Sequence, residues 1–225
     1  MTGLQKLLMW KAASGGGDGL PAEYQRVSYL QTSGYNARID TGVSGNNEAL
    51  EFDCDITTVV KVGYGCVFGN QYTDNYRGWR LMLGPSAAER YFFCSTYNRK
   101  AGSSMAVYVV PEGETLVGKR VRFLISIGRC TSETSDYSYT ATADADTTQE
   151  ISTRNIGIGA GHPGQSGASD LSFLIWRFKI SESGTLIRDY IPCVRLSDSK
   201  AGFYDLVNKT FNPSIGSEDF TAGNV

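Results

Sequence analysis

Three carboxylates stand at alternate positions in one short stretch: Glu51, Asp53 and Asp55. The other positions of residues 50–56 are apolar, so an extended strand would place all three carboxylates on one face. Hydrolysis of a glycosidic bond requires two carboxyl groups, about 5–5.5 Å apart in retaining enzymes, and one of them must have a raised pKa. Glu51 and Asp55 are therefore candidates for that chemistry. The alternative interpretation is the solvated outer face of an amphipathic strand.

A second candidate is the polar and aromatic stretch 70–79. Sugars are bound by such sets, because the C–H face of a sugar ring stacks on Tyr or Trp while amide, carboxylate and guanidinium groups bond its hydroxyls. We expect a loop here, and Trp79 to begin the next strand, where core packing is its favoured role. The alternative interpretation is an ordinary polar turn. The candidate ligand-binding residues are Tyr72, Asp74, Asn75, Tyr76, Arg77 and Trp79.

The single histidine, His162, lies in the glycine-rich stretch 159–167. A catalytic dyad needs a nucleophile within hydrogen-bond reach, and the sequence shows no nucleophile elbow nearby. One histidine also cannot build a multi-histidine metal site. We therefore expect a residue at the tip of a loop, with no catalytic role.

The five cysteines form no C-x-x-C pair, and their number is odd. Both features disfavour a zinc site and a complete set of disulfides. We expect buried free thiols, as in a protein assembled in a reducing cytoplasm, and we expect neither a metal nor a cofactor. The cysteines are Cys54, Cys66, Cys94, Cys130 and Cys193.

Charge is balanced along the 225 residues, with 21 Lys and Arg against 23 Asp and Glu. No stretch has the clustered basic residues that a phosphate backbone requires, so nucleic acid is not an expected partner. No segment has the roughly 20 apolar residues of a membrane span. The apolar run 7–10 is cut by Lys11 and is shorter than the roughly 7–15 residues of a signal-peptide core. We therefore expect a soluble protein without membrane insertion.

The elements that position these candidates begin at residue 20. From there on, strand and turn signals predict one domain over residues 20–225. Many short strands without a long helical pattern favour two packed antiparallel sheets. A hairpin turn is expected at residues 182–184. The predicted strands cover residues 50–56, 65–69, 79–83, 91–95, 105–110, 121–127, 137–143, 149–153, 156–160, 173–180 and 185–190.

Residues 1–13 differ from the rest, because Leu4, Leu7 and Leu8 form an apolar stripe at helical spacing. A helix this short is marginal alone in water and must dock onto something. Residues 14–19 are rich in glycine and predict a flexible linker. We expect a helix that anchors the domain or drives homo-oligomerisation. The alternatives are a helix folded back on its own domain and a disordered tail.

The two ends of the domain carry the most specific patterns. The opening one is Leu20–Gly34, which continues to Ile39–Gly42, and the closing one is Arg188–Cys193 followed by Ala201–Phe211. Together they resemble the first and last strands of the laminin-G-like, concanavalin-A-like jelly rolls found in structural proteins of tailed bacteriophages and prophages. In that family the closing stretch commonly reads glycine, leucine, tyrosine, aspartate, leucine, valine, asparagine, and here Phe203 replaces the first leucine.

The resemblance covers residues 20–42 and 172–223, while residues 43–171 match only as a generic jelly roll. It implies that the two ends lie close together and close the sandwich, with a two-residue hairpin loop at Asn208 and Lys209. It also implies a non-enzymatic virion protein, made in the host cytoplasm. Such a tail-fibre, head-fibre or appendage subunit would bind other virion proteins through its N-terminal segment. The displayed domain would adhere to surface or mucus glycan.

Two alternatives to adhesion are left open by this resemblance. One is an architectural decoration protein without a ligand. The other is a glycoside hydrolase, since jelly-roll glucanases similar to laminarinase use Glu-x-Asp-x-Glu on a strand. This sequence departs from that pattern at Asp55 and lacks the flanking tryptophans. Laminin-G-like domains often bind calcium at a rim, but the spacing of Asp40, Asp74 and Asp170 specifies no metal site.

Overall fold

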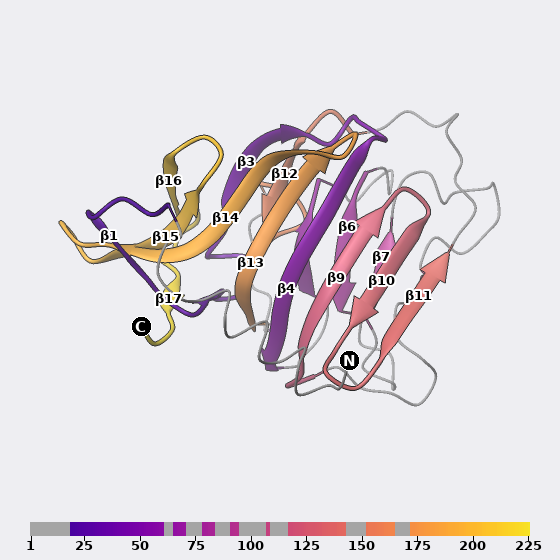
Figure 1. The fold of residues 1–225 in the computed structure, drawn as a ribbon, viewed down its shortest axis with the longest axis horizontal. Helices are drawn as coiled ribbons and strands as arrows, with labels where there is room; N and C mark the ends of the chain where they lie inside the picture. The colour runs from indigo at the N-terminus through magenta and orange to yellow at the C-terminus, as the bar shows by residue number, and fades with distance from the viewer. Residues whose placement is uncertain are drawn as a thin grey trace.

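The computed structural model describes residues 19–60, 65–70, 78–83, 91–94, 107–108, 117–142, 152–164 and 172–225. Within these ranges the chain is all-β, without a helix, and its strands form two antiparallel sheets (Figure 1). The predicted two-sheet sandwich of jelly-roll type is therefore confirmed. The predicted helix over residues 1–13 and residues 14–18 of the linker lie outside the described residues.

The larger sheet, sheet A, lies in front in Figure 1. Its main path is β11 (Ser138–Thr142), β10 (Arg129–Glu133), β9 (Arg120–Ser126), β4 (Leu50–Val60), β13 (Ser172–Glu182), β14 (Thr185–Arg195), β15 (Lys200–Asp205) and β16 (Thr210–Pro213). Three short strands from the chain ends join it: β1 (Tyr24–Arg26), β2 (Leu30–Gln31) and β17 (Thr221–Ala222).

The smaller sheet, sheet B, packs behind sheet A. Its order is β3 (Ile39–Ser44), β12 (Asn155–Ile158), β5 (Gly65–Gly69), β6 (Arg80–Leu83), β7 (Tyr91–Cys94) and β8 (Val107–Tyr108). Most of the predicted strands are present, but β10 was not predicted. Of the predicted strand over 149–153, the described residues 152 and 153 are not in a strand.

Aromatic side chains from both sheets fill the space between them. Phe52 of sheet A packs against Phe68 and Trp79 of the sheet B side, with ring centroids 4.7 and 5.1 Å apart. Phe178 of sheet A meets Phe68 at 5.1 Å. All four side chains are almost completely buried. Burial of each such ring contributes roughly 2–3 kcal/mol, so this cluster is a main source of stability.

The hairpin between β13 and β14 has the tight turn that the sequence predicted. Glu182 pairs directly with Thr185, which leaves Ser183 and Gly184 as the two loop residues. Both have positive φ, 50° and 75°. This is the pattern of a type I′ turn, whose twist matches that of the flanking strands.

The first and last strands of the domain lie together beside β13 and β14, as the resemblance implied. β2 pairs with β13 at Leu174 and Ile175, and β17 pairs with β2. β1 instead pairs with β14, in the part of that strand beyond Tyr190. Strands from both ends of the domain therefore belong to sheet A.

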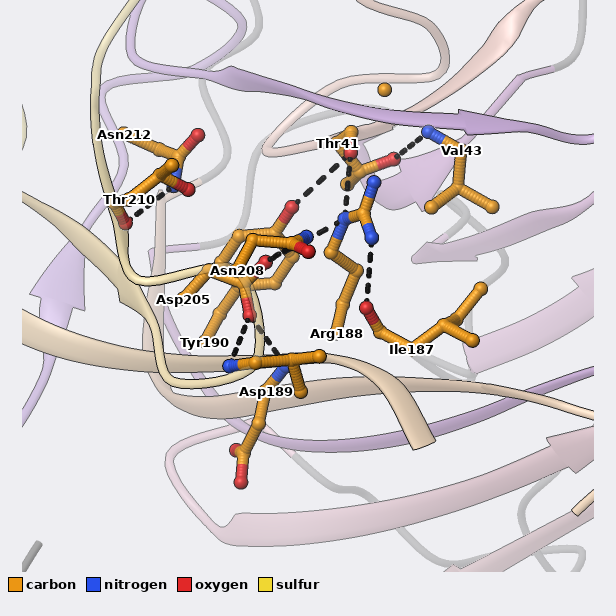
Figure 2. Close-up of polar contacts among 12 residues, drawn as sticks. Thr41, Val43, Ile187, Arg188, Asp189, Tyr190, Asp205, Asn208, Thr210 and Asn212 are labelled. Carbon is orange, nitrogen blue, oxygen red and sulfur yellow. Dashed lines mark hydrogen bonds and ion pairs between the residues drawn. The ribbon is translucent and has the colours of Figure 1, made fainter. Parts of the chain in front are cut away.

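The turn after β15 is organised by the buried carboxylate of Asp205 (Figure 2). Its Oδ1 accepts the backbone N–H groups of Asp189 and Val207 at 3.1 and 3.0 Å. Its Oδ2 accepts the side-chain amide of Asn208 at 2.8 Å. The predicted two-residue loop at Asn208 and Lys209 is wrong. Asp205 pairs with Thr210, so the loop runs over residues 206–209, and its polar groups turn inward to satisfy the carboxylate.

Arg188 connects this turn to the other sheet. Its Nε lies 3.6 Å from Oδ2 of Asp205 and donates to the carbonyl oxygen of Thr41, on β3, at 3.1 Å. The Tyr190 hydroxyl donates to the same carbonyl at 3.3 Å. Burial, and then the charge of Asp205, raise the pKa of Tyr190, so the phenol keeps the proton that it donates. The cluster therefore ties the end of the chain to both sheets.

Replacing this carboxylate tests its importance for the fold. Asp205→Asn would replace Oδ2, toward which Asn208 and Arg188 point, with an amide nitrogen that cannot accept from them. It should lower the free energy of unfolding by about 2–4 kcal/mol. The matched control is Asp198→Asn, because the Asp198 side chain is 44% exposed and contacts Arg195 and the N–H of Lys200 at the surface; its urea midpoint should barely change. Urea denaturation measures both. Equal, small effects would contradict the role assigned to Asp205.

Candidate functional site

The predicted glycan-binding loop lies mostly outside the described residues. This holds for Tyr72, Asp74, Asn75, Tyr76 and Arg77, and also for the predicted anchoring residues Leu4, Leu7 and Leu8. The two ends of the loop are described, however. Asn70 follows β5, and Gly78 and Trp79 precede β6, so the loop connects two neighbouring strands at one end of sheet B.

A single buried side chain joins these ends to a third segment. The side-chain oxygen of Asn70 accepts the N–H of Trp79 at 2.7 Å, and the backbone N–H of Asn70 donates to the Trp79 carbonyl at 3.0 Å. The Asn70 amide nitrogen donates to the carbonyl oxygens of Ser152 and Arg154, at 3.1 and 3.2 Å. The base of the predicted loop is therefore closed and attached to residues 152–154. We call this end of sheet B the Asn70 rim.

Two glycines make room for this arrangement. A Cβ on Gly45 would lie 1.7 Å from the side-chain nitrogen of Asn70, and one on Gly78 would lie 2.2 Å from its side-chain oxygen. Gly78 also has φ +116°, a conformation that other residues rarely adopt. The approach of three chain segments to one amide thus depends on the absence of two side chains.

Trp79 is a core residue, and its position rules out a role as a surface platform for sugar. Its side chain is fully buried and packs edge-on against Phe52. The strand alternation explains this, since Trp79 and Leu81 both face the interior. Trp79 therefore presents no surface on which a ligand could stack.

His162 lies at the same end of sheet B, beside Arg154. The Arg154 Nη1 is 3.3 Å from Nδ1 of the imidazole. Partial burial, then the charges of Arg154 and Arg38, lower the pKa of His162, so the ring is neutral near pH 7.

The described residues hold no group of three or more His, Cys, Asp or Glu side chains placed to bind a metal. Asp40 already accepts bonds from the N–H of Gly42 at 2.8 Å and the side chain of Asn155 at 3.2 Å. Asp74 and Asp170 lie outside the described residues.

The acidic strand face is confirmed as the outer face of β4, and arginines of β9 bind two of its carboxylates. Asp53 forms a fork with Arg122, with both bonds at 2.8 Å. Asp55 forms a second fork with Arg120. Burial raises the pKa of Asp55, and Arg120 opposes that rise. Glu51 is exposed at the start of the same strand. A carboxylate held by a bidentate arginine is poorly suited to act as a nucleophile.

A surface aromatic pair was missed in the sequence. Trp176 lies on β13, and its ring meets Tyr29 edge-on at 5.1 Å. The guanidinium carbon of Arg120 is 4.1 Å from the centre of the indole. The sequence gives no clear signal, because residues 173–176 are all apolar. In the structure the buried positions are 173 and 175 before Trp176 but 178 and 180 after it, and this one-residue shift marks a β-bulge.

Four cysteines, Cys54, Cys66, Cys130 and Cys193, are buried free thiols, as expected. Burial raises the pKa of all four, to about 11 for Cys66 and to about 12 for Cys193. They are therefore protonated and unreactive near neutral pH. The side chain of Cys94 lies outside the described residues.

No family model matches this chain, and no curated protein matches it. Among solved structures, the full extracellular region of zebrafish Gpr126/Adgrg6 is similar over 89% of this chain, with 13% sequence identity and a TM-score of 0.47. The chain spans 27% of the length of that neighbour. The assignment as a β-sandwich therefore rests on the strand pairing of the chain itself. In the described ranges, we find no helix long and apolar enough to cross a bilayer.

The Asn70 rim can be tested through the glycine beside it. Gly45→Ala should lower the free energy of unfolding by about 1–3 kcal/mol, because the new methyl group collides with the Asn70 side chain, which three hydrogen-bonded groups hold in place. Gly164→Ala is the matched control, since its Cβ would meet His162 only at 3.5 Å. Urea denaturation measures both variants. A neutral Gly45→Ala would contradict the close approach described here.

Proposed function

We propose that this chain is a non-enzymatic virion protein of a tailed bacteriophage or prophage, a fibre or appendage subunit that displays its β-sandwich for adhesion to surface glycan. The terminal segments 20–42 and 172–223 support the phage origin through their resemblance to that family. The Asn70 rim supports adhesion, and it is the observation on which this proposal depends. A rigid closed base is what a binding loop needs, because it reduces the conformational entropy lost when a ligand binds.

The outer face of β4 supports the non-enzymatic part of the proposal. A glycoside hydrolase would use Glu51 and Asp55, and one of these must take the nucleophilic or acid–base role. Asp55 is instead held in a fork with Arg120, and its side chain is only 13% exposed. Architectural decoration without a ligand remains the competing function, and it is an outcome of the binding test below.

Binding would occur through the loop 71–77, with Tyr72 and Tyr76 as stacking surfaces and Asp74, Asn75 and Arg77 as hydroxyl partners. The N-terminal segment would connect the domain to other virion proteins or to sister subunits. Neither nucleic acid nor membrane insertion is part of this proposal.

A glycan array of bacterial surface and mucin oligosaccharides tests adhesion. The full-length chain should bind a defined subset, and the double variant Tyr72→Ala, Tyr76→Ala should lose at least about tenfold in affinity, since stacking contacts contribute about 1–2 kcal/mol. Leu196→Ala, at a side chain 55% exposed on the β14–β15 hairpin, is the control and should bind normally. No binding by the full-length chain would favour the decoration function. Unchanged binding by the double variant would exclude this loop.

Light scattering tests the N-terminal segment. The full-length chain should form a trimer or a larger oligomer, and a chain lacking residues 1–19 should be monomeric, because the leucine stripe is expected to bury itself between subunits. Leu4→Ala, Leu7→Ala, Leu8→Ala in one chain keeps the length and should also be monomeric. A monomeric full-length chain at high concentration would contradict self-assembly through this segment.

A further inference from the structure

A second, smaller apolar cluster lies on the outer face of sheet A, away from the aromatic core. Side chains alternate along β14 and β15. Tyr190 and Phe203 face the interior, whereas Ile191, Cys193 and Tyr204 face outward and are nonetheless buried. β14, β15 and β16 lie at the left of Figure 1, and the charged strands β4 and β9 lie to their right. This end of the outer face is therefore apolar.

The cover over this cluster is incomplete. It consists of four partly buried side chains, two from the start of the described chain and two from the segment after β15: Leu20, Tyr24, Leu206 and Phe211. The Tyr24 ring lies 5.0 Å from that of Tyr204 and 5.3 Å from that of Phe211. Val207, next to Leu206 in the turn, is 41% exposed. We call the surface formed by Leu20, Leu206, Val207 and Phe211 the Val207 patch.

The described chain begins at the edge of this patch. A Cβ on Gly19 would lie 3.8 Å from Cδ2 of Leu206 and 4.0 Å from Nζ of Lys209. The leucine stripe of residues 4–8 therefore precedes a point beside the patch. Residues 9–18 separate the stripe from Gly19 and span at most about 35 Å when fully extended. The stripe is thus tethered close to the surface that its own domain presents to a neighbour.

The stripe is too short to be buried between helices alone. A coiled coil needs apolar positions sustained over at least three or four heptads, whereas Leu4, Leu7 and Leu8 cover little more than one helical turn. A single helix of this length is also marginal in water. The stripe therefore requires an apolar surface on a folded domain, and the Val207 patch is such a surface.

Charge favours the same pairing. Residues 1–13 include Lys6 and Lys11 and no Asp or Glu. Glu23 is exposed beside the patch. Burial, then Tyr24 and the charge of Glu23, raise the pKa of Tyr204, which places that carboxylate near the outer cluster. A basic segment would therefore meet an acidic group at the border of the patch.

We propose that the Val207 patch of one subunit binds the leucine stripe of a sister subunit. This inference rests on the self-assembly proposed above and names the surface that carries it. The contact is head-to-tail, with the segment of one copy on the domain of the next, so repeated contacts close into a ring if the rotation between copies allows it. The loop 71–77 connects two strands of sheet B and is not part of this contact.

Light scattering of full-length variants tests the patch. Val207→Asp should raise the concentration at which half of the chains are assembled by at least about tenfold, because an apolar side chain is lost and a carboxylate is buried in the contact. The matched control is Leu186→Asp, since Leu186 is 39% exposed and belongs to neither apolar cluster. Its assembly should be unchanged. Urea midpoints check that both variants are folded.

Disulfide trapping identifies which chain provides the segment, and does not depend on the charged variant. A Leu7→Cys chain and a Val207→Cys chain are mixed, assembled and oxidised. We expect a disulfide-linked dimer with one chain of each kind, at a yield at least about fivefold above that of either chain alone. The four buried native thiols do not compete, because burial raises their pKa values and keeps them protonated.

Three results would overturn the proposal, and they differ in what they leave standing. Unchanged assembly of Val207→Asp without a mixed disulfide would keep self-assembly but place the stripe on another surface. A disulfide that forms only within one chain carrying both cysteine substitutions would show the segment folded on its own domain. A monomeric full-length chain would remove self-assembly itself, and this contact with it.

Discussion

One buried carboxylate, that of Asp205, holds the end of this domain together. It accepts two backbone N–H groups and one side-chain amide, and its charge is balanced by Arg188, which also bonds to a strand of the opposite sheet. A buried charge is tolerable only when all of these partners are present. The need to hydrogen-bond and neutralise the Asp205 carboxylate therefore explains both the turn 206–209 and the position of β15 beside β14. The two sheets are coupled through the same group.

The short strands from the two ends of the domain all belong to sheet A. β1, β2 and β17 occupy the space where β14 departs from β13, so sheet A is completed only when the first and last residues of the domain are both in place. Sheet B contains no terminal strand and connects its strands by longer segments. The strands from the ends of the domain therefore belong to sheet A, and the longer connections in sequence belong to sheet B.

The charged groups of sheet A show why acidic residues on a strand are ambiguous in sequence. Asp53, Asp55 and Glu51 have the spacing of a catalytic set, yet two of them are forked by arginines from β9, about 65 or more residues away in the chain. Arg177 and Asp189 repeat the arrangement between β13 and β14. These pairs stabilise the outer face modestly, and they reduce the availability of the carboxylates for chemistry.

The sequence alone determined the β-sandwich, the apolar face of β4, the tight turn at Ser183 and Gly184, and the closeness of the two ends. These follow from local alternation, from turn chemistry and from recognisable end segments. Tertiary structure alone decided the burial of Trp79, the closure of the rim by Asn70, the arginine forks and the outward turn of Trp176. Each of these depends on partners distant in sequence, because side-chain contacts across a sandwich are set by strand order and register, which a single sequence does not encode locally.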